Sequence, residues 1–279
     1  MFIDTHTRET MLRSFCSVLR ISQYELRDVI WEIYRSTGND YDDCISKIEA
    51  FIYEHISDES LPDEILLFHF ARRLKGTEED TIGRNLADLL TTPNALSDFL
   101  KDHQLTFEMG EQHIETYYKG NVVDWDKCWE GNNAYMKVRF GYYKGREDFC
   151  FNGFAFKDRL YKNDYARQLY GVPEFLSGLV ECLGCQKVEE DFMENSDYYC
   201  YEYKLPFEKV MFDDHDSYSL HQKQIYLLRC VFERLMDYQC SDPRYLFDHD
   251  NPILRLGDYD TIPEEMFVTK ELVTLDMLR

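Results

Sequence analysis

The chain of 279 residues lacks the features that would assign it to a class at once. No stretch approaches the roughly 18 uninterrupted apolar residues of a membrane helix, so we expect no membrane-spanning segment. The sequence contains no Gly-x-Gly-x-x-Gly, Walker, Gly-x-Ser-x-Gly or His-Glu-x-x-His motif. This removes the commonest signatures of dinucleotide, nucleotide, hydrolase and zinc-protease sites.

Positive charge is also scarce. The chain has 31 basic against 53 acidic residues, a formal net charge of −22. Such a charge repels nucleic-acid phosphates and anionic membranes, so we expect neither direct nucleic-acid binding nor membrane binding. It is compatible with a basic protein partner, and equally with simple solubility.

The cysteines do not form a disulfide pattern. There are nine, an odd number at irregular spacing, which favours buried thiols in a reducing compartment. The first residues, Met1 to Arg13, are polar and include no apolar signal core, so we expect a cytoplasmic protein. The pair Cys182-Leu183-Gly184-Cys185 closes a predicted helix and has no second pair, so we interpret it as core and helix cap, and neither a zinc nor a redox site.

Hydrophobic periodicity divides the chain near Pro62. Apolar stripes at helical spacing predict a helical N-terminal unit over residues 1–60, and short alternating runs follow over residues 61–279. We therefore predict an α+β protein with a mainly antiparallel sheet region and flanking helices. Among the predicted elements are strands at 65–74, 105–109, 135–140 and 198–205, a helix from Ile82 to Leu90 capped by Asp80 or Thr81, and a long helix over 220–238.

The apolar run Ile65-Leu66-Leu67-Phe68-His69-Phe70-Ala71-Arg72-Arg73-Leu74 carries a histidine and two arginines into a predicted core strand. Imidazole and guanidinium groups gain nothing from a core unless they are paired or used. His69 and Arg72 are therefore candidates for a site. The alternative is a buried histidine bonded to the backbone, with Arg72 or Arg73 in a surface ion pair.

Two acidic clusters contain a histidine, Asp213-Asp214-His215-Asp216 and Asp248-His249-Asp250. Carboxylate and imidazole groups suit a divalent metal. Both clusters lie in polar loop sequence, where adjacent side chains rarely converge, so we predict solvated acidic loops and no metal site.

The segment Phe68-His69-Phe70, the later aromatic strand Tyr198-Tyr199-Cys200-Tyr201-Glu202-Tyr203 and the closing Ile262-Pro263-Glu264-Glu265 together resemble the ADP-ribosyltransferase superfamily, over residues 65–275. The resemblance implies that NAD is the substrate and that His69 and Glu202 are the catalytic pair. The Ser-Thr-Ser motif and the Glu-x-Glu pair of the arginine-modifying branch are absent.

The resemblance also implies a set of NAD-binding residues. Beside His69, a cation such as Arg72 or Arg139 would hold the pyrophosphate. The aromatic that stacks on the nicotinamide is one of Tyr142, Tyr143 and Tyr165.

Two functions are compatible with these observations. The first is an NAD-using ADP-ribosyltransferase-like toxin or phage-defence effector, with a protein target or a cognate antitoxin as partner. The second is a non-enzymatic acidic binding protein that neutralises a basic partner, as an immunity protein, an inhibitor or a nucleic-acid mimic does. Acidic blocks such as Glu78-Glu79-Asp80 and Glu189-Glu190-Asp191 motivate the second.

Overall fold

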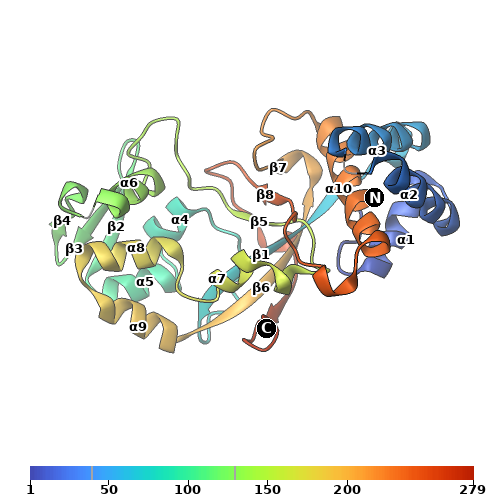
Figure 1. Ribbon diagram of the computed structural model, residues 1–279. Helices are drawn as coiled ribbons and strands as arrows, with labels where there is room; N and C mark the ends of the chain where they lie inside the picture. Colours follow the sequence, from blue (N-terminus) through green and yellow to red (C-terminus); the bar gives the residue numbers. More distant parts are fainter. Residues whose placement is uncertain (39, 129) are drawn as a thin grey trace. The chain divides into compact units, whose positions relative to one another are not determined.

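The computed structural model describes residues 1–38, 40–128 and 130–279. It is an α+β protein that begins with three helices and continues with antiparallel sheets and flanking helices, which confirms the predicted fold class (Figure 1). The chain forms two compact units, each built from three segments. Unit 1 comprises residues 1–68, 153–164 and 203–255, and unit 2 comprises residues 69–152, 165–202 and 256–279.

Unit 1 contains a helical layer. The helices α1 (Arg8–Leu19), α2 (Gln23–Thr37) and α3 (Tyr41–His55) pack against the long helix α10 (Leu220–Cys240). Each helix begins where the sequence provides a cap, since Thr7, Ser22, Asp40 and Ser219 accept a hydrogen bond from a first-turn amide. The aliphatic residues of the apolar stripes predicted from the sequence, such as Met11, Ile30 and Ile48, form the buried faces of these helices, whereas the tyrosines Tyr24, Tyr34 and Tyr41 of the same stripes are exposed.

The larger sheet has the strand order β7-β8-β5-β1-β6-β9. Its strands are β1 (Glu64–Leu74), β5 (Asn152–Phe154), β6 (Ser196–Pro206), β7 (Met211–Phe212), β8 (Ile253–Arg255) and β9 (Phe267–Leu272). The strand β5 runs antiparallel to β1, with Phe68 opposite Phe154. The two longest strands, β1 and β6, contribute residues to both units.

Unit 2 has its own core, formed by helices and a three-stranded antiparallel sheet. The strands are β2 (Leu105–Met109), β3 (Ile114–Tyr118) and β4 (Asn121–Val122). The helices are α4 (Leu86–Thr91), α5 (Ala95–Asp102), α6 (Glu130–Arg139), α8 (Glu174–Leu183) and α9 (Gln186–Glu194). A short helix, α7 (Asp164–Gln168), begins at the last residue of a unit 1 segment. Short 3₁₀ helices are η1 (Asp58–Ser60), η2 (Trp125–Lys127), η3 (Leu160–Lys162), η4 (Phe207–Lys209), η5 (Pro243–Tyr245) and η6 (Glu264–Met266).

Two element predictions in unit 2 are wrong. The alternating run 135–140 forms the end of helix α6, because Met136 and Phe140, four residues apart, are both fully buried in the unit 2 core. The predicted helix from Ile82 starts later: the cap of α4 is the side chain of Asn85, which accepts from the amide of Asp88, while Asp80 holds a loop instead.

One cysteine pair departs from the prediction of free thiols. Cys128 and Cys182 form a disulfide with Cα atoms 5.1 Å apart. The other seven cysteines form no disulfide, and five of them are buried. Gly184 ends α8 in the left-handed conformation, with φ of 64°, as its predicted role as a helix cap requires.

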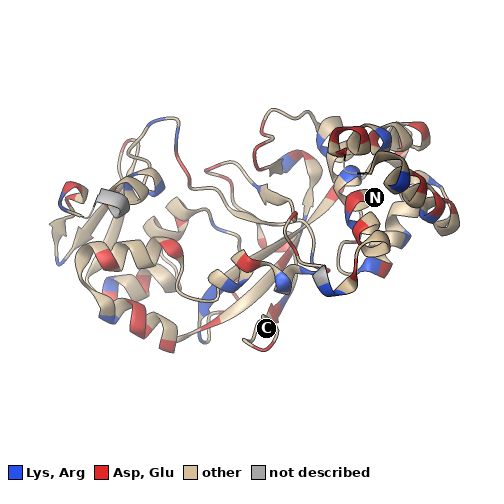
Figure 2. Cartoon of the chain, in the orientation of Figure 1, with Lys and Arg blue, Asp and Glu red and all other residues tan. Residues whose placement is uncertain are grey.

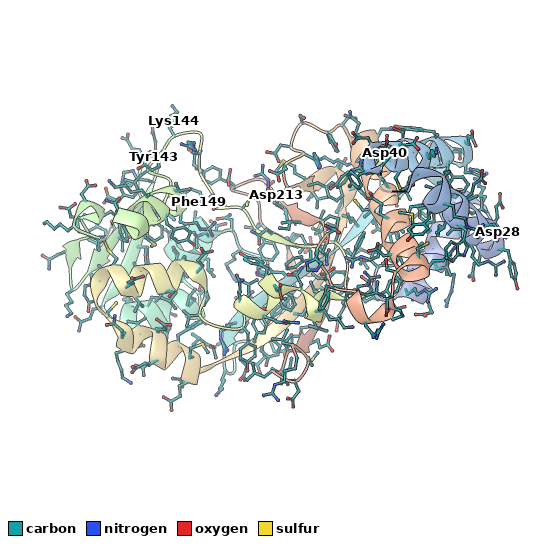
Figure 3. The ribbon with its side chains drawn as sticks, viewed as in Figure 1. Asp28, Asp40, Tyr143, Lys144, Phe149 and Asp213 are labelled. Atoms are coloured by element: carbon teal, nitrogen blue, oxygen red, sulfur yellow. A yellow bond between two sulfur atoms is a disulfide. The ribbon has the colours of Figure 1, made fainter. Side chains whose placement is uncertain are left out.

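The two acidic clusters differ. Asp213 and Asp216 are half exposed and form ion pairs with Arg255, and Figure 3 labels Asp213. Asp248 is buried, contrary to the prediction of a solvated loop, because it pairs with Arg234 of α10 and accepts from Asn163 and Asn251. Within the described residues no helix is long and apolar enough to cross a membrane.

Candidate functional site

A pocket of about 200 Å³ lies within unit 2, along the second half of β1. Its walls combine two kinds of residue. The apolar ones include Phe70, Leu86, Leu89, Phe151, Phe175 and Phe192, and the polar ones include His69, Arg72, Arg73, Asp80, Arg84 and Arg139. Apolar walls with a few converging polar groups are typical of a small-molecule site.

His69 extends from the predicted strand, which is confirmed as β1. Its Nδ1 lies 2.7 Å from the carbonyl oxygen of Asn152, and its ring lies 4.1 Å from the ring of Phe151. Burial and the nearby charge of Arg73 lower the pKa of His69 to about 3. The ring is therefore neutral at pH 7. Because a carbonyl only accepts, Nδ1 carries the proton and Nε2 is a hydrogen-bond acceptor.

Arg72 has only weak partners. Its Nε lies 3.2 Å from the sulfur of Met193, its Nη1 lies 3.4 Å from the carbonyl oxygen of Ser196, and its guanidinium lies over the ring of Tyr170. Burial lowers the pKa of Arg72, although the group stays charged at any physiological pH. No carboxylate of the described residues forms an ion pair with it.

Arg73, like Arg72, lies over a tyrosine ring. Its guanidinium lies 4.9 Å from the ring centre of Tyr201, a cation–π contact, and among the described residues it too has no carboxylate in an ion pair. Among the residues that the structure describes, neither Arg72 nor Arg73 forms the surface ion pair that the alternative expects. The backbone bond of His69, by contrast, is the one that the alternative predicted.

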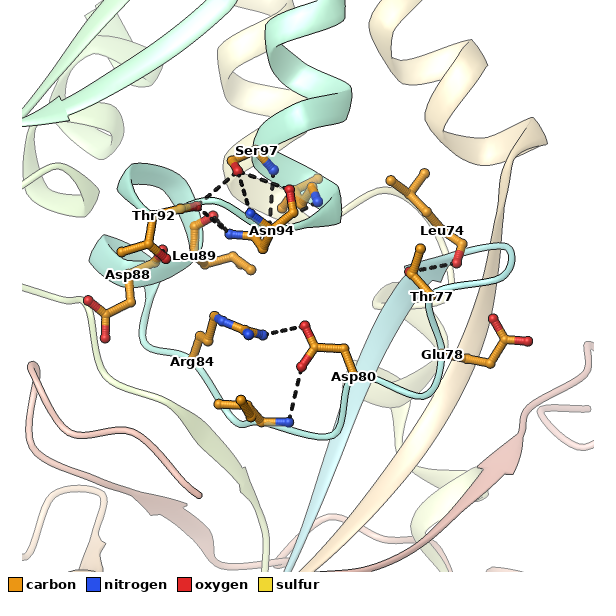
Figure 4. A network of polar contacts seen from close by, with 12 residues as sticks. Leu74, Thr77, Glu78, Asp80, Arg84, Asp88, Leu89, Thr92, Asn94 and Ser97 are labelled. Carbon is orange, nitrogen blue, oxygen red and sulfur yellow. Dashed lines mark hydrogen bonds and ion pairs between the residues drawn. The ribbon is translucent and has the colours of Figure 1, made fainter. Parts of the chain in front are cut away.

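The two other arginines of the pocket are neutralised. Arg84 Nη1 lies 2.5 Å from Asp80 Oδ2, and the other Asp80 oxygen accepts from the amide of Ile82, which holds the loop before α4 (Figure 4). Arg139 pairs with Asp148; burial opposes its charge, but Asp148 raises the pKa of Arg139 above its usual value. The pocket lining thus keeps two arginines, Arg72 and Arg73, that form no ion pair with a described carboxylate, although the charge of Asp197 acts on Arg72.

This positive excess contrasts with the rest of the chain. Figure 2 shows Asp and Glu along helices and loops in both units. A cationic pocket in a protein of net charge −22 attracts a negatively charged ligand locally while the surrounding surface repels it.

Of the residues expected from the sequence, His69, Arg72 and Arg139 line this pocket together. Glu202 does not line it. Arg73 lies on Tyr201, which puts Tyr201 on the face of His69 and Arg73, and successive side chains of β6 alternate between faces. Glu202 is therefore directed to the opposite face of the sheet from His69, where it is buried.

The three candidate tyrosines also lie outside the residues that line the pocket. Tyr142 packs on the ring of His113, and Tyr143 is exposed beside Lys144 in the loop that follows α6 (Figure 3). Tyr165 belongs to α7 and is also exposed.

Sequence reasoning missed Arg84 and Asp80. A spacing of four residues between Asp and Arg predicts an ion pair on a helix. Asp80 and Arg84 lie in a loop, so the spacing alone did not predict their contact. Within the described residues, no group of three His, Cys, Asp or Glu side chains is placed to hold a metal ion.

Comparison of the chain with protein-family models, with curated proteins and with solved structures finds no match.

Proposed function

We propose that the pocket of unit 2 binds a phosphate-bearing nucleotide, and that NAD, the substrate implied by the sequence resemblance, is such a ligand. The observation that carries the proposal is the pair Arg72 and Arg73, two residues of the pocket lining whose guanidinium groups form no ion pair with a described carboxylate. Guanidinium groups bind phosphate oxygens through charge-assisted hydrogen bonds.

The neutral His69 supports the same proposal. Because the Nδ1–H of His69 donates a hydrogen bond to the Asn152 carbonyl oxygen, Nε2 can accept a hydrogen bond from a ribose hydroxyl. A pKa of about 3 makes it a poor general base at pH 7, so its role in this proposal is to position the ligand.

ADP-ribosyl transfer would need a carboxylate near the ribose that loses its base. Since Glu202 is directed away from the face of His69, we propose nucleotide binding first and treat transfer as a separate measurement. Release of nicotinamide from NAD, lost in Glu202→Gln, would support the enzyme.

Isothermal titration with NAD, ADP-ribose and pyrophosphate tests the binding. Each of Arg72→Met and Arg73→Met removes one charged donor, a loss of about 1.5–3 kcal/mol. We expect their affinities to fall about tenfold to a hundredfold. Arg146→Met is the matched control, because Arg146 is exposed, belongs to the same unit and does not line the pocket.

The proposal fails if none of the three ligands binds at millimolar concentration. It also fails if the control variant weakens binding as much as the two pocket variants do, because the effect would then come from net charge alone.

A further inference from the structure

The pocket follows one edge of strand β1. Six consecutive residues, His69 to Leu74, line it. Side chains of consecutive strand residues point to opposite faces of a sheet, so a pocket on one face would be lined by every second residue. An uninterrupted run of lining residues indicates that the pocket lies along the strand's edge and reaches its main-chain groups.

Hydrogen bonds identify which main-chain groups face that edge. The amide of Lys75 donates to the carbonyl oxygen of Asn195, at the start of β6, over 2.9 Å. The N–H and C=O groups of alternate residues point to the same side of a strand. The odd-numbered residues of β1 therefore face β6, and Phe70, Arg72 and Leu74 face the other edge.

That edge is only partly covered. The neighbouring strand β5 starts at Asn152, and its register, with Phe68 opposite Phe154, puts Asn152 opposite Phe70. Arg72 and Leu74 thus lie beyond the start of β5. The carbonyl of Leu74 accepts from the amide and the hydroxyl of Thr77, at 3.0 and 2.8 Å.

Three main-chain groups remain at this edge, the N–H and C=O of Arg72 and the N–H of Leu74. In the part of the chain that the structure describes, no hydrogen-bond partner is recorded for them. On a strand edge, the carbonyl of one residue and the amide of the second residue after it lie next to each other. The pocket therefore offers an acceptor and a donor side by side, between apolar walls.

We propose that the pocket binds an adenine base along this edge of β1. The adenine N6 amine donates a hydrogen bond to the Arg72 carbonyl, and the adenine N1 accepts one from the Leu74 amide. The proposal rests on nucleotide binding at the same pocket and names the base. The ring lies between apolar side chains such as Phe70 and Leu89, and the phosphates lie toward Arg72, on the same face of β1 as Phe70.

Size and polarity favour adenine. A volume of about 200 Å³ is below the range of about 300–1,000 Å³ of whole-ligand pockets, so one ring system enters and the remainder stays at the mouth. Guanine has the acceptor O6 where adenine has the donor N6 amine, and the donor N1–H where adenine has the acceptor N1. It matches this edge only when turned over, which moves its ribose and phosphates away from Arg72.

Ligand analogues test the two hydrogen bonds without any change to the protein. The wild-type chain is titrated with ADP, 1-deaza-ADP, purine riboside diphosphate, 7-deaza-ADP and GDP. We expect 1-deaza-ADP, which lacks the acceptor, and purine riboside diphosphate, which lacks the amine, each to bind about tenfold more weakly than ADP. The matched control, 7-deaza-ADP, changes a nitrogen outside this pair and should stay within about twofold of ADP.

A variant pair locates the base. Ala95 lines the pocket, so Ala95→Trp should fill it and abolish the preference for ADP over pyrophosphate. Ala134→Trp, at an exposed position of α6 outside the pocket, should keep that preference. Circular dichroism of both variants confirms that they are folded.

Equal binding of ADP, GDP and pyrophosphate would overturn the adenine proposal and leave phosphate binding intact. Failure of every ligand to bind would overturn the proposed function as well. A preference for ADP that survives Ala95→Trp, in a folded variant, would place the base elsewhere and also overturn the proposal.

Discussion

The buried ion pair of unit 1 allows a quantitative test of what holds that unit together. Arg234 on α10 pairs with Asp248, and the two side chains are 4% and 0% exposed. The carboxylate also accepts from Asn163 at 3.2 Å and from Asn251 at 2.8 Å. Every contact of Asp248 is therefore made with the protein interior. Arg234 supplies the positive charge in direct contact with it, and the same guanidinium also interacts with the buried carboxylate of Asp158.

The variant Arg234→Met keeps most of the side-chain volume and removes the charge. It leaves the Asp248 carboxylate buried without its cation, which costs about 3–5 kcal/mol of the free energy of unfolding. Since a domain is stable by about 5–15 kcal/mol, this loss is a large fraction of the total. Urea unfolding followed by circular dichroism should show a midpoint lower by about 1–2 M.

Two controls separate the charge from the packing. The exposed pair Arg244–Asp242 has side chains 78% and 38% exposed, so Arg244→Met should leave the urea midpoint nearly unchanged. The double variant Arg234→Met with Asp248→Asn removes both charges and should recover part of the loss, since the buried Asp158 still lacks the charge of Arg234. A loss below about 1 kcal/mol in Arg234→Met, or no recovery in the double variant, would refute the reasoning.

Two further predictions concern unit 2. His103 Nε2 lies 3.0 Å from Asp191 Oδ2; burial opposes the charge on the ring, but bonds to Asp191 and to the Phe99 carbonyl raise the pKa of His103. The stabilisation is therefore present below the ordinary pKa of about 6.5 and lost as pH rises through the raised value, so His103→Gln should cost up to about 1 kcal/mol at pH 6 and less at pH 8.5. A cost that does not change with pH would contradict it. Gly184 has φ of 64° and open space around its missing Cβ, so Gly184→Ala should cost about 1 kcal/mol of backbone strain. Gly171→Ala, at a glycine without positive φ, should be nearly neutral in the same urea assay.

The sequence by itself determined the elements whose residues carry a local signal. Helices α1–α3 follow from apolar stripes and from caps such as Ser22 and Asp40, which act within one turn. The strand that carries His69 follows from its apolar run, and the cap at Gly184 follows from the conformational freedom of glycine. Each of these depends on residues a few positions apart.

The alternation of apolar and polar residues led to the wrong prediction of a strand at residues 135–140. Apolar and charged residues alternate there as in a strand, yet Met136 and Phe140 are also one helical turn apart. The burial of both in the unit 2 core selected the helix. Asp248 was misjudged for a related reason, since its partner Arg234 comes from another element and no loop sequence indicates a distant cation.

Tertiary structure alone decided the candidate site. The sequence identified His69, Arg72 and Arg139, but whether they meet depends on β1, α6 and the loop before α4 coming together. Only strand register shows that β5 stops opposite Phe70 and leaves the main chain of Arg72 and Leu74 uncovered. Sequence periodicity predicts the face of a sheet to which a side chain points. It does not predict where a strand lacks a neighbour, because neighbouring strands come from distant parts of the chain.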